Sequence, residues 1–376
     1  TNITSYNNSA SGFYTTGAEN TLSDIVSYGN SSYGVFSSGS NSSLSNIISY
    51  NNDGSGVHSS GSNTSLVNVT SYGNDGVGIY CSGDGSTFAD IESYENDNYG
   101  YQVNSNLVHR IWEDDILDSL NAFPDVIGIT GGTYTQTTEW VDEYQYTVFG
   151  SFTLADESSL TLEPGTIMKF NPGDVKIEIQ GQLIAQGTPG DSIYFTSYYD
   201  DNIGGDTDSE PNIPSRGDWQ QLYFNGADIG TSLDYCVFRY GGREWYIYVS
   251  SNSRYYYYNT LRLNNSQINI SNSIIEETYG TTGSYSRYPY AIWIESNAQS
   301  TLTNLIVRNN NLYGVVSSGG LLTMTGCEVY NNGSDGVNSS GSGCSFTNLL
   351  VFNNSASGIY TTGAENTLSD IVSYGN

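Results

Sequence analysis

The strongest constraint on the fold is a 22-residue period. Asparagines recur with this step at positions 8, 30, 52, 74 and 96, and glycines recur at 12, 34, 56, 78 and 100. The period returns near the end of the sequence, at Asn310, Asn332, Asn354 and Asn376. These stretches are rich in Gly, Asn, Ser and Thr, which are poor helix formers, and they lack a 3.6-residue hydrophobic period. A helical repeat is therefore excluded.

Each period predicts one coil of a stack, with about three short strands and three turns. Stacked coils place equivalent residues one strand spacing apart, roughly 4.8 Å, and pair each backbone with the coils on either side. The columns that contain Leu22 and Ile25 should point inward. Asn30 should follow at a turn, where its amide can bond along its own column. The column of Tyr28 should point outward, because Arg308 also belongs to it.

A second, longer repeat joins the two ends of the sequence. Residues 1–30 and 347–376 match at 25 of 30 positions, and residues 9–30 and 355–376 differ only at Phe13 and Ile359. The shift of 346 residues is not a multiple of 22, so the duplicated unit is a whole domain. The sequence also starts inside a repeat, which indicates a segment of something longer.

The regular period breaks after about residue 104. Residues 105–126 are charged and leucine-bearing, which predicts a short helical or irregular cap ended by Pro124, with new strands from residue 127. We therefore expect three parts. Residues 1–104 would be the C-terminal coils of one unit, 105–126 a cap or linker, and 127–376 the start and body of the next unit.

Residues 149–196 contain Ser159-Leu-Thr-Leu-Glu-Pro-Gly-Thr-Ile-Met-Lys-Phe170 and Gly181-Gln-Leu-Ile-Ala-Gln-Gly187, and residues 217–224 and 233–242 continue in the same style. This resembles the opening turns of secreted right-handed parallel β-helix repeat proteins, which have the pectate-lyase-like fold, of the surface-layer or adhesin type. The resemblance covers about residues 127–376. It implies an all-β, right-handed parallel β-helix with coils of about 22 residues and a capping break near 105–126. It does not define the function, because that fold carries lyases, hydrolases, adhesins and surface-layer proteins.

The charge limits the partners. With 39 Asp and Glu against 10 Lys and Arg, the net charge of −29 argues against nucleic acid and anionic membranes, and no apolar run is long enough to span a membrane. Asn-x-Ser/Thr sequons suit a glycosylated extracellular or cell-surface protein, although a chain this rich in Asn, Ser and Thr also produces them by chance. The candidate acceptors are Asn2, Asn7, Asn30, Asn41, Asn63, Asn68, Asn264, Asn269, Asn332, Asn338 and Asn353.

The sequence offers little for catalysis. Its only histidines are His58, in a column with Tyr14, Phe36 and Tyr80 that should be exposed, and His109, in the cap. Neither has a pair of aspartates at a useful spacing, so we expect no enzyme and no catalytic residue. The best metal candidate is an acidic loop with ligands suited to Ca²⁺; the alternative is a solvated acidic insertion. Its candidate ligands are Asp200, Asp201, Asp206, Asp208 and Glu210.

Aromatic residues mark two candidate surfaces. The outward column of Tyr6, Tyr28, Tyr50, Tyr72 and Tyr94 should stack ring against ring and stiffen the stack, with sugar or partner binding as the alternative. Two interruptions of the period should project as hairpins or long turns, and their Tyr, Trp and Arg suit contact with another copy, with a glycan, or ordinary packing. These residues are Trp245, Tyr246, Tyr248, Arg254, Tyr255, Tyr256, Tyr257, Tyr258, Tyr285, Arg287 and Tyr288.

Together these features predict a structural tandem-repeat segment of an extracellular fibre, filament or surface-layer protein. Its partners would be copies of itself, joined end to end and laterally. An adhesin or carbohydrate-binding β-helix that contacts extracellular glycans is the alternative, and a polysaccharide lyase or hydrolase is less favoured.

Overall fold

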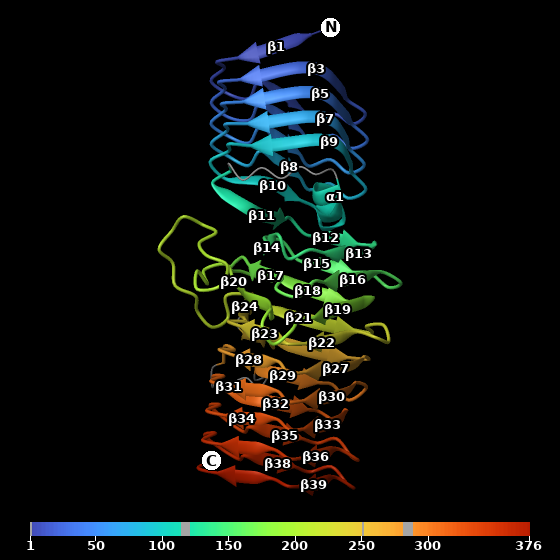
Figure 1. Ribbon diagram of the computed structural model, residues 1–376, viewed down its shortest axis with the longest axis vertical. Coiled ribbons are helices and arrows are strands. Elements are labelled where there is room, and N and C mark those ends of the chain that lie inside the picture. The colour runs from blue at the N-terminus through green and yellow to red at the C-terminus, as the bar shows by residue number, and fades with distance from the viewer. Residues whose placement is uncertain (1, 114–120, 250–251, 281–288) are drawn as a thin grey trace. The chain divides into compact units, whose positions relative to one another are not determined.

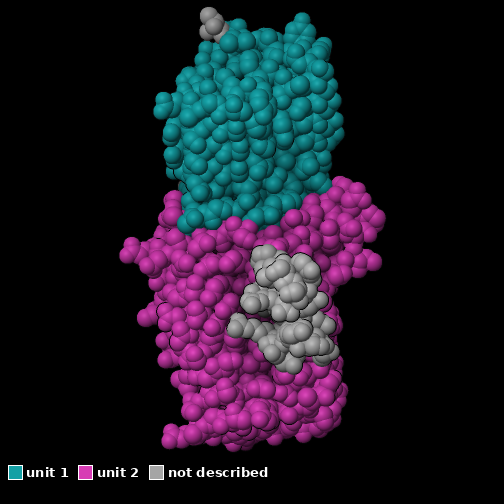
Figure 2. All heavy atoms as spheres, turned by 180° about the vertical axis from the view of Figure 1, so that it is seen from behind, with its two compact units in different colours: residues 1–134, 143–150 teal, residues 135–142, 151–376 magenta. Residues whose placement is uncertain are grey.

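The computed structural model describes residues 2–113, 121–249, 252–280 and 289–376. They form two compact units, which Figure 2 shows in different colours: residues 1–134 and 143–150, and residues 135–142 and 151–376. Both units consist of stacked parallel strands, so the expected all-β parallel solenoid with coils of about 22 residues is confirmed. These two units are defined by contacts within the fold. The division at residues 104 and 126 is defined instead by the sequence repeat, and it stays a prediction. The right-handed sense of the helix also stays a prediction.

Two parallel sheets make up most of the first unit, and Figure 1 shows the strands of the first of them stacked in order. That sheet contains β1 (Ile3–Tyr6), β3 (Thr21–Tyr28), β5 (Ser43–Tyr50), β7 (Ser65–Tyr72) and β9 (Thr87–Tyr94). The second contains β2 (Phe13–Thr15), β4 (Val35–Ser37), β6 (Val57–Ser59), β8 (Ile79–Cys81), β10 (Tyr99–Val103), β11 (Phe123–Ile129) and β14 (Gln145–Val148), and β12 (Gly132–Tyr134) also belongs to this unit.

Regular coils of the first unit have two strands each instead of about three. The long strand of each coil bends at a residue with a left-handed backbone, such as Asp24 (φ 57°) or Asn46 (φ 53°). Asp and Asn accept this conformation more readily than most residues. In the second unit the same bend, at Asn348 (φ 53°), separates two strands, β36 and β37. The expected three segments per coil are therefore present, with two of them continuous in the first unit.

A helical insertion follows β10, as expected, and consists of η1 (Ser105–Leu107) and α1 (Val108–Glu113). The sheet nevertheless continues past it, because Val103 of β10 pairs with Ile129 of β11. The expectation that Pro124 ends the insertion is wrong: Pro124 lies within β11, which starts at Phe123 and not near residue 127. The register between β10 and β11 shifts just after Phe123, and a bulge of this kind tolerates a proline because no ladder hydrogen bond needs its missing N–H.

The second unit has three parallel sheets and one hairpin. One sheet runs through β17 (Ile167–Phe170), β20 (Ile193–Ser197), β23 (Cys236–Arg239), β28 (Ile274–Glu276), β31 (Ile306–Arg308), β34 (Glu328–Tyr330), β37 (Leu350–Phe352) and β40 (Val372–Tyr374). The next runs through β15 (Phe152–Leu154), β18 (Lys176–Ile179), β21 (Gln221–Asn225), β26 (Leu261–Asn264), β29 (Tyr290–Ile294), β32 (Tyr313–Ser317), β35 (Val337–Ser339) and β38 (Ile359–Thr361). The third runs through β13 (Thr137–Trp140), β16 (Ser159–Leu162), β19 (Gln182–Gln186), β22 (Ser232–Asp234), β27 (Gln267–Ser271), β30 (Gln299–Thr303), β33 (Leu321–Thr325), β36 (Ser345–Thr347) and β39 (Thr367–Ser369).

Inward columns fill each unit with apolar side chains, and the columns of Leu22 and Ile25 become fully buried in the next coils, at Leu44 and Ile47. The glycine column is explained by close packing: a Cβ at Gly34 would overlap Ser49 Oγ of the same coil. All four cysteines are free and buried, and burial raises the pKa of the Cys81 thiol to about 11.

The predicted asparagine ladder is present at the turns. Asn30 Nδ2 donates to Asn52 Oδ1 at 2.8 Å, and Asn52 Nδ2 donates to Asn74 Oδ1 at 2.9 Å. The same contact joins Asn74 to Asn96 and, after the longer coil that holds the helical insertion, Asn96 to Asn121. Each buried amide therefore finds its partner in the next coil, which removes the penalty for burying an unpaired polar group.

Candidate functional site

The outward tyrosine column stacks along the first unit as expected. Tyr28 and Tyr50 have ring centroids 4.8 Å apart with planes 7° apart, and Tyr6, Tyr72 and Tyr94 extend the stack at 5.0 to 5.1 Å. Because the rings cover one another's faces, the column presents ring edges and hydroxyl groups. Sugar rings bind aromatic residues through ring faces, so this geometry favours a structural role.

A second outward column contains His58. Its ring stacks on Phe36 at 5.0 Å and on Tyr80 at 4.1 Å. We expected this ring to be exposed, but it is half-buried. Loss of solvent around it lowers the pKa of His58 to about 4. His109, the other histidine, is buried where α1 begins.

Alternating charges replace the aromatic stack in one outward column of the second unit. Arg239 Nε lies 3.1 Å from Glu276 Oε1, and Arg308 Nε lies 2.8 Å from Glu276 Oε2. Arg308 also donates to Tyr330 Oη at 3.2 Å, where the aromatic stack resumes. A step of 22 does not reveal this ladder, because insertions set its first two members 37 positions apart.

The acidic loop folds around a lysine of its own chain. Lys169 is fully buried, and its Nζ donates to the backbone carbonyl of Gly205 within the loop. Burial lowers the pKa of Lys169, while four loop carboxylates act in the opposite direction. These are Asp201, Asp200, Asp206 and Asp208. The loop therefore carries a cation from the protein itself.

The five candidate calcium ligands do not converge on one point. Asp200 is fully buried, accepts from Thr196 Oγ1 at 2.6 Å and lies 3.3 Å from Arg239 Nη1. Asp206 accepts the backbone N–H of Asp208 at 2.8 Å, which fixes the local turn. Across the described ranges, no group of three or more His, Cys, Asp or Glu side chains could hold a metal ion. Weak binding of Ca²⁺ by the loop Asp200–Glu210 stays a prediction.

The first aromatic interruption forms the expected hairpin, of β24 (Glu244–Val249) and β25 (Asn252–Tyr257) paired antiparallel. Tyr258 follows at its base and is half-buried, and its N–H donates to the Arg243 carbonyl at 2.9 Å. Only the backbone of the hairpin is described, which leaves the side chains of Trp245, Tyr246, Tyr248, Arg254, Tyr255, Tyr256 and Tyr257 outside the described part. Tyr285, Arg287 and Tyr288 of the second interruption also lie outside the described residues.

Arginines near the interruptions are neutralised by their own unit. Arg243 Nε lies 3.2 Å from Asp174, and Arg262 Nε lies 2.7 Å from Glu295. The Arg262 guanidinium also lies over two aromatic rings, 4.4 Å from that of Tyr223 and 5.0 Å from that of Trp293. Counting Arg239, which pairs with Glu276, three arginines of this region therefore have carboxylate partners in their own unit.

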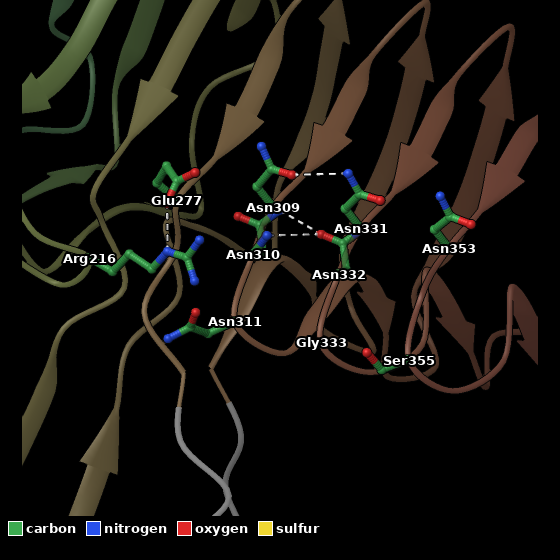
Figure 3. A pocket seen from close by; sticks show the side chains of 10 residues that line it. All are labelled: Arg216, Glu277, Asn309, Asn310, Asn311, Asn331, Asn332, Gly333, Asn353 and Ser355. Atoms are coloured by element: carbon green, nitrogen blue, oxygen red, sulfur yellow. Dashed lines mark hydrogen bonds and ion pairs between the residues drawn. The ribbon is translucent and has the colours of Figure 1, made fainter. Parts of the chain in front are cut away.

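An open polar groove of about 370 Å³ lies on the second unit (Figure 3). Figure 3 shows the carboxamides of Asn309, Asn331 and Asn353 side by side along its upper edge. Asn331 Nδ2 donates to Asn309 Oδ1 at 3.4 Å, a long bond. At one end Arg216 Nε contacts Glu277 Oε2 at 2.6 Å. The groove therefore presents a periodic row of hydrogen-bond donors and acceptors. The sequence did not reveal this row, because only Asn353 of the three stood out there, as a glycosylation candidate.

Burial sorts the candidate glycosylation sites. Asn30 and Asn332 are fully buried and donate their Nδ2 within the ladder, so they are closed to modification in the folded protein. Asn264 and Asn338 are half-buried. The exposed acceptors are Asn2, Asn7, Asn41, Asn63, Asn68, Asn269 and Asn353.

The fold is a parallel β-solenoid. Aromatic and charged side chains of its outward columns contact the equivalent side chains of adjacent coils. Comparisons with known proteins found no match to a protein-family model, to a curated protein or to a solved structure. No helix in the described part of the chain is long and apolar enough to cross a membrane.

Proposed function

We propose that this chain is a structural tandem-repeat segment of an extracellular fibre, filament or surface-layer protein. Copies would continue end to end along the solenoid and associate laterally through the aromatic interruptions. The proposal includes no catalytic step. Exposed sequons and the charge of −29 support an extracellular location.

The observation that carries the proposal is the duplicated coil. Coil 9–30 holds coil 31–52 through the ladder bond from Asn30 to Asn52, the Tyr28–Tyr50 stack and the parallel pairing of β3 with β5. Coil 355–376 differs from coil 9–30 at one position and is itself stacked in register on the coil before it, with Asn354 Nδ2 donating to Asn376 Oδ1 at 2.8 Å. It therefore offers a following coil the same contacts, and continuing the ladder pairs strand edges that would otherwise be open.

Electron microscopy of the native protein tests the proposal. We expect unbranched rods with a regular axial repeat, bundled side by side. Isolated particles, or measurable release of product from pectin or alginate that a single Asp or Arg substitution abolishes, would contradict it.

Glycan binding is a second candidate, favoured by the groove of Asn309, Asn331 and Asn353. Successive sugars of an extended polysaccharide advance by a distance similar to the strand spacing, so carboxamides in register can bond hydroxyls along such a chain. We expect Asn331→Gly with Asn353→Gly to abolish binding of neutral oligosaccharides in titrations followed by NMR. Glycine keeps the left-handed backbone at both positions, and Asn51→Gly (φ 52°) on the first unit is the matched control. Unchanged binding in the groove variant would exclude this site.

A further inference from the structure

Contacts between successive coils depend on the residue at the bend of the long strand. At the bend of coil 9–30, Asp24 Oδ1 accepts from Asn46 Nδ2 of the next coil at 3.0 Å. One coil further, Asn46 Oδ1 accepts from Asn68 Nδ2 at 2.9 Å. Side chains in this column therefore touch across the coil boundary, and the carboxylate of Asp24 is matched by an amide donor.

A second column, in the turn before the long strand, also has a carboxylate followed by asparagines. Glu19 is followed by Asn41 and Asn63, and all three have left-handed backbones with φ of 60°, 57° and 54°. Asn63 Nδ2 donates to Asn41 Oδ1 at 3.2 Å, so side chains of this column also meet. In both columns of coil 9–30, the residue that follows the carboxylate is an asparagine.

Coil 355–376 has the same two carboxylates at the equivalent positions, Glu365 (φ 60°) and Asp370 (φ 55°). We propose that this coil accepts a following coil with the sequence of residues 31–52 and rejects a second coil of its own sequence. In the accepted arrangement, equivalents of Asn41 and Asn46 meet the carboxylates. In the rejected one, Asp24 would face Asp370 across the sheet, where like charges directly opposite each other are destabilising, and Glu19 would face Glu365 in the turn that precedes the long strand. The proposal rests on the tandem continuation proposed above.

Like charges also recur in one column of exposed turns. Asp53, Asp75 and Asp97 also recur with a step of 22, but they lie at exposed turns outside the strands. Asp24, in contrast, lies within β3 and accepts from Asn46 of the next coil at 3.0 Å. The charge rule therefore applies to the columns in which side chains touch.

Such selectivity matters for a protein made of repeats. A tandem array contains many coils of nearly identical sequence, and any open coil edge can pair with the wrong copy. Repulsion between identical coils disfavours stacking of separate chains through them, while the coil that follows in the same chain is accepted. The partner of this face is thus the next repeat of the same chain.

Two extensions of the full chain test the proposal. After Asn376, one adds residues 31–104, and the other adds residues 9–30 before 31–104. Hydrogen exchange is read at the amides of Gly358, Ile359, Glu365 and Gly375. Their equivalents Gly12, Phe13, Glu19 and Gly29 donate to the following coil at 2.9 to 3.0 Å, so these amides report whether a coil has stacked.

We expect the first extension to protect these amides and the second to protect them about tenfold less, because two like-charge pairs act together. Glu19→Gln with Asp24→Asn in the added coil should restore protection. Asp53→Asn with Asp75→Asn, the matched loss of two charges, should not. Equal protection by both extensions, or equal rescue by the control pair, would overturn the inference alone. No protection in the first extension would overturn the tandem function and this inference with it.

Discussion

At the scale of single residues, charged and titratable side chains find their contacts within the same stack of coils. Lys169 is buried against the acidic loop, Arg262 lies over Tyr223 and Trp293, and His58 is stacked between Phe36 and Tyr80. Burial lowers the pKa values of His58 and Lys169, since desolvation disfavours the charged form. A side chain that looks functional in the sequence can therefore serve the stack alone.

His58 gives stability a pH dependence with a definite sign. Its pKa is about 4 in the folded protein and 6.5 in the unfolded chain, so the unfolded chain binds more protons between these values. Stability should fall as the pH drops from 6.5 to 4, by on the order of 1 kcal/mol, because the ring is only half-buried. Urea unfolding of the wild type and of His58→Tyr, which matches the Tyr and Phe of its column, measures this term as the difference between the two proteins. A difference that stays constant over this range would contradict the stated environment of His58.

At the scale of the coil, the asparagine ladder joins each turn to the next. Asn52 accepts from both the backbone N–H and Nδ2 of Asn30, at 3.2 and 2.8 Å, and donates to Asn74 at 2.9 Å. Its removal leaves several buried polar groups without partners, which costs far more than the loss of one exposed contact.

We expect Asn52→Ala to destabilise the protein by about 2–4 kcal/mol. Ile48→Ala, in the same coil at a position that is 42% exposed, should change stability by less than about 0.5 kcal/mol. Urea unfolding monitored by circular dichroism measures both. Similar losses for the two variants would show that the ladder adds nothing beyond local packing.

The regular coils could be predicted from sequence because their spacing is constant. A step of 22 aligns Asn30 with Asn52 and Tyr28 with Tyr50 without any knowledge of the fold. The alignment is lost where insertions change the step, to 37 positions from Arg239 to Glu276 and to 32 positions from Glu276 to Arg308.

Other misses have local causes. Pro124 suggested the end of a helix, yet it lies at a register shift of β11, a feature that no propensity reveals. Lys169 looked like an ordinary residue of an alternating strand. Its burial follows from a loop that starts about 30 residues later and returns over it.

At the scale of the whole molecule, the chain carries a net charge of −29, and the aromatic and arginine side chains described on its regular coils contact neighbours in the stack. Lateral contact therefore has to come from segments outside the regular coils. The β24–β25 hairpin is such a segment, because within the described residues its two strands pair only with each other. It contains Trp245, Arg254 and a run of tyrosines, which are residue types enriched at the centres of protein interfaces.

Lateral association should strengthen with salt, because the net charge of −29 on each chain opposes contact and added ions screen this repulsion. We expect Tyr255, Tyr256 and Tyr257, each changed to Ser, to weaken bundling at least tenfold, since burial of each ring contributes roughly 1.5–3 kcal/mol before ordering costs. Tyr258 is left intact because its N–H closes the base of the hairpin on Arg243.

The control changes Tyr6, Tyr14 and Tyr360 to Ser, three tyrosines at least 50% exposed and outside the hairpin. Light scattering between low and physiological salt, with circular dichroism to confirm the fold, separates the outcomes. Hairpin and control variants that bundle equally well would remove the hairpin from the interface and move support to the glycan-binding alternative.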